Sequence, residues 1–106
     1  MIYELRQYRV KKGKMKQWRK VMEEMIVPFQ ESQGMVIPAG FAVPREKDLY
    51  IWLRRFRNEA ERKRQYRKVY ESDQWKKVIA PRVDELLDTS AIVVTDLAPE
   101  PWSVLQ

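Results

Sequence analysis

The chain has 106 residues, enough for one domain and too few for two ordinary ones. It contains no cysteine and no histidine, which excludes disulfides, a thiol nucleophile, and the usual zinc and proximal haem ligands. The net charge is +6, yet every charged residue from Asp84 onward is acidic. Such an uneven distribution of charge along the chain favours an anionic partner or head-to-tail association between subunits.

No segment has the pattern of a signal peptide, and no apolar run approaches the roughly 20 residues needed to span a membrane. We therefore expect a cytoplasmic protein with no membrane partner. The cluster Asp84, Glu85 and Asp88 has the spacing of a solvated helical turn. We therefore expect no metal site and no cofactor.

The first predicted element is a strand at 2–10, rich in β-branched and aromatic residues. A helix at about 13–33 follows; Pro28 should kink it late, and Gly34 is placed to end it. Its apolar stripe recurs at spacings of three and four and is expected to be core: Met15, Trp18, Met22, Met25 and Phe29.

Two further strands are predicted at 35–43 and 48–56, and Pro38 requires the first of them to lie at a sheet edge or to carry a bulge. Asn58 and Glu61 then have the spacing of a capping box, which begins a helix.

Ser72 has the position of a second helix cap, and Pro81 should bend or restart the helix that follows. The apolar stripe of that helix comprises Trp75, Val78, Ile79, Val83, Leu86 and Leu87. Residues 91–97 form the last predicted strand of a single domain at 1–98. Residues 99–106 form a C-terminal arm that either covers its own barrel or reaches across a dimer, unless it is disordered.

This order of elements predicts an α+β, ferredoxin-like β-α-β-β-α-α-β fold, with helices on one face of a four-stranded antiparallel sheet. Right-handed crossovers place the first and third strands at its centre. We expect Leu49, Ile51 and Leu53 to face the helices. The alternate residues would then leave an apolar patch on the open face, which soluble monomers seldom expose. A homodimer that packs sheet to sheet around a barrel-like interior is the expected solution.

The residues predicted to line that shared interior form the candidate pocket: Glu4, Arg6, Tyr8, Tyr50, Trp52, Arg54 and Phe56. Buried charges are costly unless they are paired and hydrogen-bonded. One interpretation is a structural network of Glu4, Arg6 and Arg54 that fixes strand register or dimer geometry. The other is a ligand pocket with aromatic walls, in which an arginine binds an anionic or carbonyl oxygen. The sequence leaves both open.

Five segments along nearly the whole chain resemble the NIPSNAP family of the dimeric α/β-barrel superfamily: YELRQY, GKMKQW, VPFQESQGMVI, LYIWLRRF and YESDQWKKVIAPRV. The resemblance implies a ferredoxin-like protomer in a dimeric α/β barrel. It implies little about activity, because most members of the family have no assigned reaction. The superfamily includes cofactor-independent monooxygenases, lactone isomerases and haem enzymes, and the absence of histidine argues against haem here.

Three classes of function follow. The first is binding of a small hydrophobic or anionic molecule in the cavity. An enzymatic alternative is a cofactor-independent monooxygenase or isomerase that uses Glu4 as base and Tyr8 as donor, with Arg6 or Arg54 stabilising an enolate or carboxylate. The third is an interaction module or a nonspecific nucleic-acid binder with a basic helix at 62–68. We do not expect nucleic acid as the partner, because the third strand lacks the RNA-recognition motif.

Overall fold

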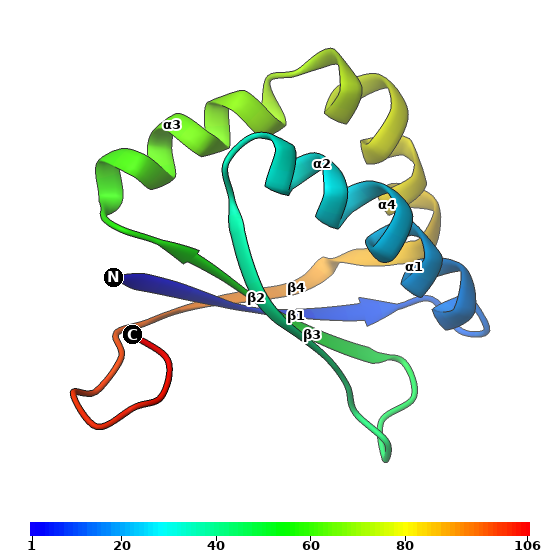
Figure 1. Cartoon of the computed structure of the whole chain (residues 1–106). Helices are drawn as coiled ribbons and strands as arrows, with labels where there is room; N and C mark the ends of the chain where they lie inside the picture. Colours follow the sequence, from blue (N-terminus) through cyan, green and yellow to red (C-terminus); the bar gives the residue numbers. More distant parts are fainter.

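The computed structural model describes all residues 1–106 and has a twisted four-stranded antiparallel sheet with every helix on one face (Figure 1). The strands are β1 (Ile2–Val10), β2 (Val36–Ala42), β3 (Leu49–Phe56) and β4 (Leu87–Leu97). Their order in the sheet is β2-β3-β1-β4, so β1 and β3 lie at the centre. This is the predicted ferredoxin-like arrangement.

Two helical segments cover the sheet. The first consists of α1 (Met15–Val21), the π-helical segment η1 (Met22–Ile26) and α2 (Val27–Ser32). The second consists of α3 (Glu59–Tyr70), the π-helical segment η2 (Gln74–Ile79) and α4 (Ala80–Leu86). None of the helices combines the length and the hydropathy needed to cross a membrane.

Each π-helical segment ends just before a proline, Pro28 in α2 and Pro81 in α4. A proline ring has no N–H and clashes with the carbonyl four residues earlier, so a regular helical turn there is strained. Widening the preceding turn to π geometry moves that carbonyl away, and the helix continues through the proline.

The predicted caps are confirmed. The Asn58 side chain accepts a hydrogen bond from the Glu61 main-chain N–H, and the Glu61 carboxylate accepts one from the Arg57 N–H. The Ser72 hydroxyl caps the next helix by accepting from the Trp75 N–H. Gly34 has a positive φ of 96° directly after the first helical segment, which favours glycine at this position.

Two strands differ in detail from the sequence pattern. Strand β2 lies at the sheet edge and shifts register between Val36 and Ala39, so Pro38 has both of the features expected of it. Strand β4 begins at Leu87 rather than at 91, because the chain passes directly from α4 into the sheet. A register shift on β1 between Gln7 and Arg9 accompanies this early start.

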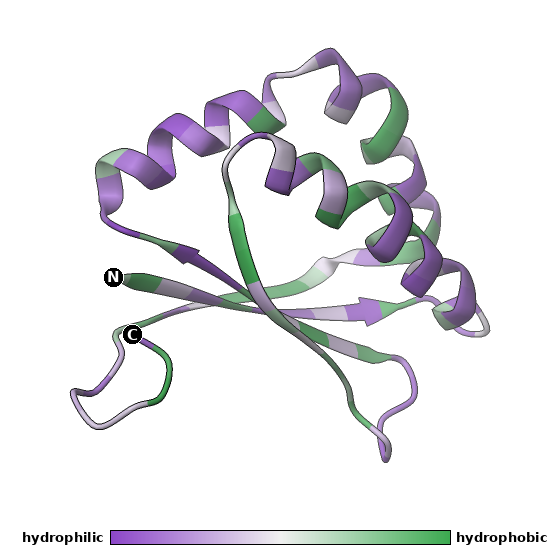
Figure 2. Ribbon diagram, in the orientation of Figure 1, coloured by the Kyte–Doolittle hydropathy of each residue, from purple (hydrophilic) through white to green (hydrophobic).

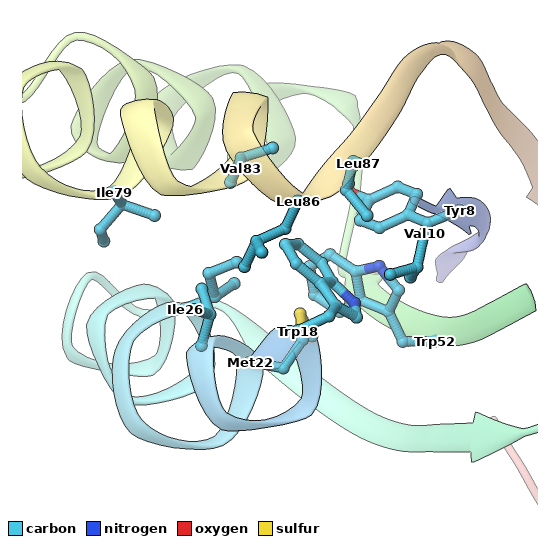
Figure 3. Close-up of a cluster of buried hydrophobic side chains, with 11 residues drawn as sticks. Tyr8, Val10, Trp18, Met22, Ile26, Trp52, Ile79, Val83, Leu86 and Leu87 are labelled. Carbon is cyan, nitrogen blue, oxygen red and sulfur yellow. The ribbon is translucent and has the colours of Figure 1, made fainter. Parts of the chain in front are cut away.

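The main apolar core lies between the sheet and the helices (Figure 3). It consists of Tyr8, Val10, Trp18, Val21, Met22, Ile26, Trp52, Ile79, Val83, Leu86 and Leu87. A second cluster of Met35, Phe56 and Val69 lies under α3. Val78, predicted to belong to the core stripe, is instead 44% exposed, because the π-helical segment changes the angular spacing on which that prediction depended.

The predicted orientation of β3 was wrong. Trp52, Arg54 and Phe56 face the helices of their own protomer, and Leu49, Ile51 and Leu53 lie on the outer sheet face. Both faces of β3 carry large apolar side chains, so alternation alone cannot decide which face the helices cover. Trp52 packs in the main core together with Trp18, and Phe56 packs in the second cluster with Met35 and Val69.

The C-terminal arm folds back against this outer face near the start of β1 (Figure 1). The Tyr3 hydroxyl donates to the main-chain oxygen of Gln106 at 2.8 Å. Trp102 and Leu105 line a hollow of about 260 Å³ together with Leu53 and other residues of the outer face. The arm therefore lies on its own protomer in the single chain, and Trp102 remains 84% exposed.

Candidate functional site

The centre of the site is an ion pair between the two middle strands. Glu4 of β1 and Arg54 of β3 are register partners, and both side chains point toward the helices. Glu4 is 1% exposed and Arg54 is 0% exposed. Arg54 donates from Nε at 3.0 Å and from Nη2 at 2.8 Å to the same carboxylate oxygen of Glu4.

The other N–H groups of Arg54 reach the helices. Nη1 donates to Gln30 Oε1 at 3.1 Å and to the Tyr70 hydroxyl at 2.7 Å, and Nη2 donates to the Tyr66 hydroxyl at 2.9 Å. These bonds use all five N–H groups of the guanidinium. The structural interpretation therefore holds for Arg54, which has no donor left for a ligand.

The second oxygen of Glu4 is bound by α3. It accepts a short hydrogen bond from the Tyr66 hydroxyl and another from Arg62 Nη1 at 3.3 Å. Arg62 also makes a bidentate pair with Asp96 of β4, at 2.8 and 3.1 Å, and a pair with Glu59. Although α3 is hydrophilic along most of its length (Figure 2), its inner side is thus fixed to the sheet by polar contacts.

This environment keeps Glu4 ionised. Burial would raise the pKa of its carboxyl, but the charge of Arg54 and the hydrogen bonds from Tyr66 and Arg54 outweigh burial, and the pKa lies below its ordinary value. Burial and the bond to Glu4 raise the pKa of Tyr66 to about 12, against the opposing charge of Arg54. A carboxylate held in this way is a poor general base, because its cationic partners disfavour proton uptake.

Arg6 lies beside the ion pair and differs from Arg54. Its Nε donates to the Tyr8 hydroxyl at 2.8 Å and its Nη1 to Glu4 at 3.3 Å. Two of its five N–H groups are thereby used and three remain. The guanidinium also lies 5.8 Å from the centre of the Trp52 ring, within the range of a cation–π contact.

A largely enclosed cavity of about 110 Å³ adjoins Arg6, between the sheet and the helices. Its lining residues are Arg6, Tyr8, Trp18, Ile26, Gln30, Trp52, Tyr70, Trp75, Val83 and Ile92. The rings of Tyr8, Trp18 and Trp52 meet at its sheet side (Figure 3), with centroids 5.8 Å apart for the pairs Tyr8–Trp18 and Tyr8–Trp52.

Several polar hydrogens in the core around this cavity have no acceptor in the protein. The indole nitrogens of Trp18 and Trp52 are buried without a hydrogen-bond partner. The Gln30 side chain accepts from Arg54, and its own amide N–H groups donate to no protein atom. Buried polar groups are nearly always hydrogen-bonded in native proteins, so these unpartnered donors are unusual. The indole nitrogens have no accessible surface, whereas Arg6 and Gln30 line the cavity.

The candidate pocket predicted from the sequence divides into three groups. Arg6, Tyr8 and Trp52 line the cavity, whereas Glu4 and Arg54 form the ion pair beside it. Tyr50 packs against Trp18, and Phe56 belongs to the second apolar cluster. All seven lie on the helix-facing side of one protomer, so the predicted location between two subunits was wrong.

The sequence analysis missed the polar contributions of the helices. Gln30 follows Ile26 by four residues and therefore continues the buried stripe, although the residue itself is polar. Tyr66 and Tyr70 are also four residues apart and share one helix face. The available signal was a polar residue, such as Gln30, at a position that the helical spacing assigns to the buried apolar stripe. Nothing in the sequence distinguished Arg62 from the other basic residues of the same helix.

The fold and this interior site define a ferredoxin-like α+β protein with an enclosed cavity between its layers. The NIPSNAP family model matches residues 3–103, and the chain belongs to the NIPSNAP family. No curated protein matches the chain.

Solved structures share the fold. Protein Atu4242 from Agrobacterium tumefaciens has a TM-score of 0.90 at 20% identity, with 100% of both chains covered. A NIPSNAP family protein of the same organism (ATU5224) has a TM-score of 0.88 at 23% identity, covering 99% of this chain and 98% of that chain. An antibiotic biosynthesis monooxygenase has a TM-score of 0.71 at 10% identity, covering 95% of this chain and 100% of that chain.

Removing either partner of the ion pair should destabilise the protein strongly, because it leaves an uncompensated buried charge. We expect Glu4→Gln and Arg54→Met each to cost on the order of 3–5 kcal/mol in urea unfolding, and the double variant to cost less than the sum. The control is Glu46→Gln, which removes the exposed Arg9–Glu46 pair and should cost about 1 kcal/mol or less. Equal costs for Glu4→Gln and Glu46→Gln would contradict this assignment.

Proposed function

We propose that this NIPSNAP protein binds a small, largely apolar molecule in the cavity between its sheet and its helices. The observation that carries the proposal is an aromatic-lined space with free hydrogen-bond donors inside a protein core. Cores are close-packed and contain few voids larger than a water molecule. Each buried donor without a partner costs about 1–3 kcal/mol. A bound molecule offsets both costs, which gives a physical reason to retain the space.

The size of the cavity limits the ligand. An engineered apolar cavity of about 150 Å³ accepts benzene, and the cavity described above has a volume of about 110 Å³. The aromatic walls suit a flat molecule, since rings pack favourably face to edge or offset. The ligand, or the part of it that enters, therefore has the dimensions of about one ring.

In this proposal the protein is a homodimer through the outer sheet face. That face carries Leu5, Ile51 and Leu53 at its centre, where Leu5 pairs with Leu53 across the two middle strands. Around them Phe41, Val93 and Leu97 are between 42% and 51% exposed. An apolar sheet face of this extent suits a second copy of the same face related by a two-fold axis.

Binding is supported better than catalysis. The free donors can stabilise an oxyanion, as a cofactor-independent monooxygenase or isomerase requires. However, Glu4, the expected base, is held by arginines and does not line the cavity.

Nucleic-acid binding through the sheet has little support. Trp52 and Phe56, the aromatic residues that would stack on bases, face the helices instead. The exposed basic residues of α3 lie on the side of that helix away from the sheet and suit a solvated surface: Lys63, Arg64, Arg67 and Lys68.

Toluene tests whether the cavity binds a ring. At about ten times its Kd, toluene should raise the midpoint of thermal unfolding by about 4 °C or more. Val83→Phe should abolish the rise, because Val83 lines the cavity and a larger side chain fills it. Val78→Phe is the control and should respond like the natural protein, since Val78 is exposed. No response in the natural protein, or an equal response in Val83→Phe, would contradict cavity binding.

Sedimentation equilibrium tests the homodimer. The natural protein should have the mass of two chains, and Val93→Glu should dissociate it by placing a charge in the apolar interface. Val78→Glu is a matched control, because Val78 is 44% exposed and Val93 is 49% exposed, but on opposite sides of the molecule. A natural protein with the mass of one chain, or a Val93→Glu variant that remains dimeric, would count against the interface.

A further inference from the structure

We infer that the cavity selects a ring-sized anion, such as a monocyclic carboxylate, whose oxygens accept hydrogen bonds from Arg6. The inference rests on the proposed function and adds two properties to it: the charge of the ligand and the atoms that hold it. Three features of the cavity carry it.

The first feature is that Arg6, which lines the cavity, has hydrogen-bond donors without a partner. Arg6 donates two of its five N–H groups to Tyr8 and Glu4, and three remain. The oxygens at the wall already accept from arginines: Tyr8 from Arg6, and Gln30 and Tyr70 from Arg54. A ligand rich in acceptors can satisfy these donors, whereas a ligand N–H would add one more donor.

The second feature is an excess of buried positive charge. Arg54 and Arg6 both contact the same oxygen of Glu4, at 2.8 and 3.3 Å, so two buried cations share one buried carboxylate. Arg62 also touches Glu4, but it is neutralised by the half-exposed Asp96 and Glu59 at the outer end of the network. A buried charge without a counterion is costly, and an anion beside Arg6 removes that cost.

The third feature is the position of Arg6 relative to the aromatic rings. Arg6 and Trp52 are register partners on neighbouring strands, and Trp18 faces them from α1. Most of the remaining lining is apolar or aromatic, with Trp75 and Val83 from the helices and Ile92 from β4. A molecule with one charged end and one flat apolar end matches a lining with one cation and mostly apolar walls, and its charged end lies toward Arg6.

Benzoate and its neutral isostere benzamide test the inference on the natural protein. We expect calorimetry to show benzoate binding at least tenfold more tightly than benzamide, which replaces one acceptor oxygen by a donor NH₂. In a proton–nitrogen NMR spectrum, benzoate should shift the indole signals of Trp18 and Trp52, because both residues line the cavity. The indole of Trp102, on the exposed arm, is an internal control and should not move.

Arg6→Met should reduce benzoate affinity at least tenfold and should reduce benzamide affinity by a smaller factor, because benzamide carries no charge. Arg9→Met is the matched control on the same strand and should keep the natural affinity, because Arg9 is exposed and bound to Glu46. The inference would be overturned if benzamide bound as tightly as benzoate, or if the Trp18 and Trp52 signals did not move. In that case a rise in thermal stability with toluene would still support cavity binding. If neither toluene nor benzoate binds, cavity binding itself is wrong.

Discussion

The buried ion pair between Glu4 and Arg54 joins the two central strands to the helices above them. Arg54 comes from β3, its carboxylate partner from β1, and its remaining contacts from α2 and α3 through Gln30, Tyr70 and Tyr66. Every N–H of Arg54 donates a hydrogen bond, and these bonds offset the free-energy cost of removing the two charges from water. All of them can form together only when the sheet and the helices have this one arrangement. The helix layer is therefore held at a defined distance from the sheet, and the cavity lies within that spacing.

The same constraint explains why Arg6 differs from Arg54. The Glu4 carboxylate is already bound by Arg54 and Tyr66. Arg6 therefore donates only one long hydrogen bond to Glu4, and it donates a second hydrogen bond to the Tyr8 hydroxyl. Arg54 thus stabilises the fold, while Arg6 presents unused donors to the cavity. Arg54 thus fits the structural interpretation of the charged strand, and in the proposed function Arg6 fits the ligand-pocket interpretation.

The sequence predicted the elements, the central strand pair, the caps at Asn58 and Ser72, and the edge position of Pro38, because each depends on local pattern or general topology. It did not predict which face of β3 meets the helices. Both Leu53 and Trp52 belong to apolar rows, and only packing against Trp18 distinguishes them. The π-helical segments were also missed, and with them the exposure of Val78. The cavity depends on Gln30 and Tyr70, whose roles appear only once the helices are placed over Arg54.

The ionisation of Glu4 tests the central claim most directly. The carboxyl carbon of Glu4 can be followed by NMR in protein labelled with carbon-13 as the pH is lowered while the protein stays folded. The account predicts that Glu4 titrates below the ordinary value of 4.5, because Arg54, Tyr66 and Arg6 stabilise its charged form against burial. A midpoint at or above 4.5 would contradict the account, since burial would then dominate and the ion pair would not organise the site.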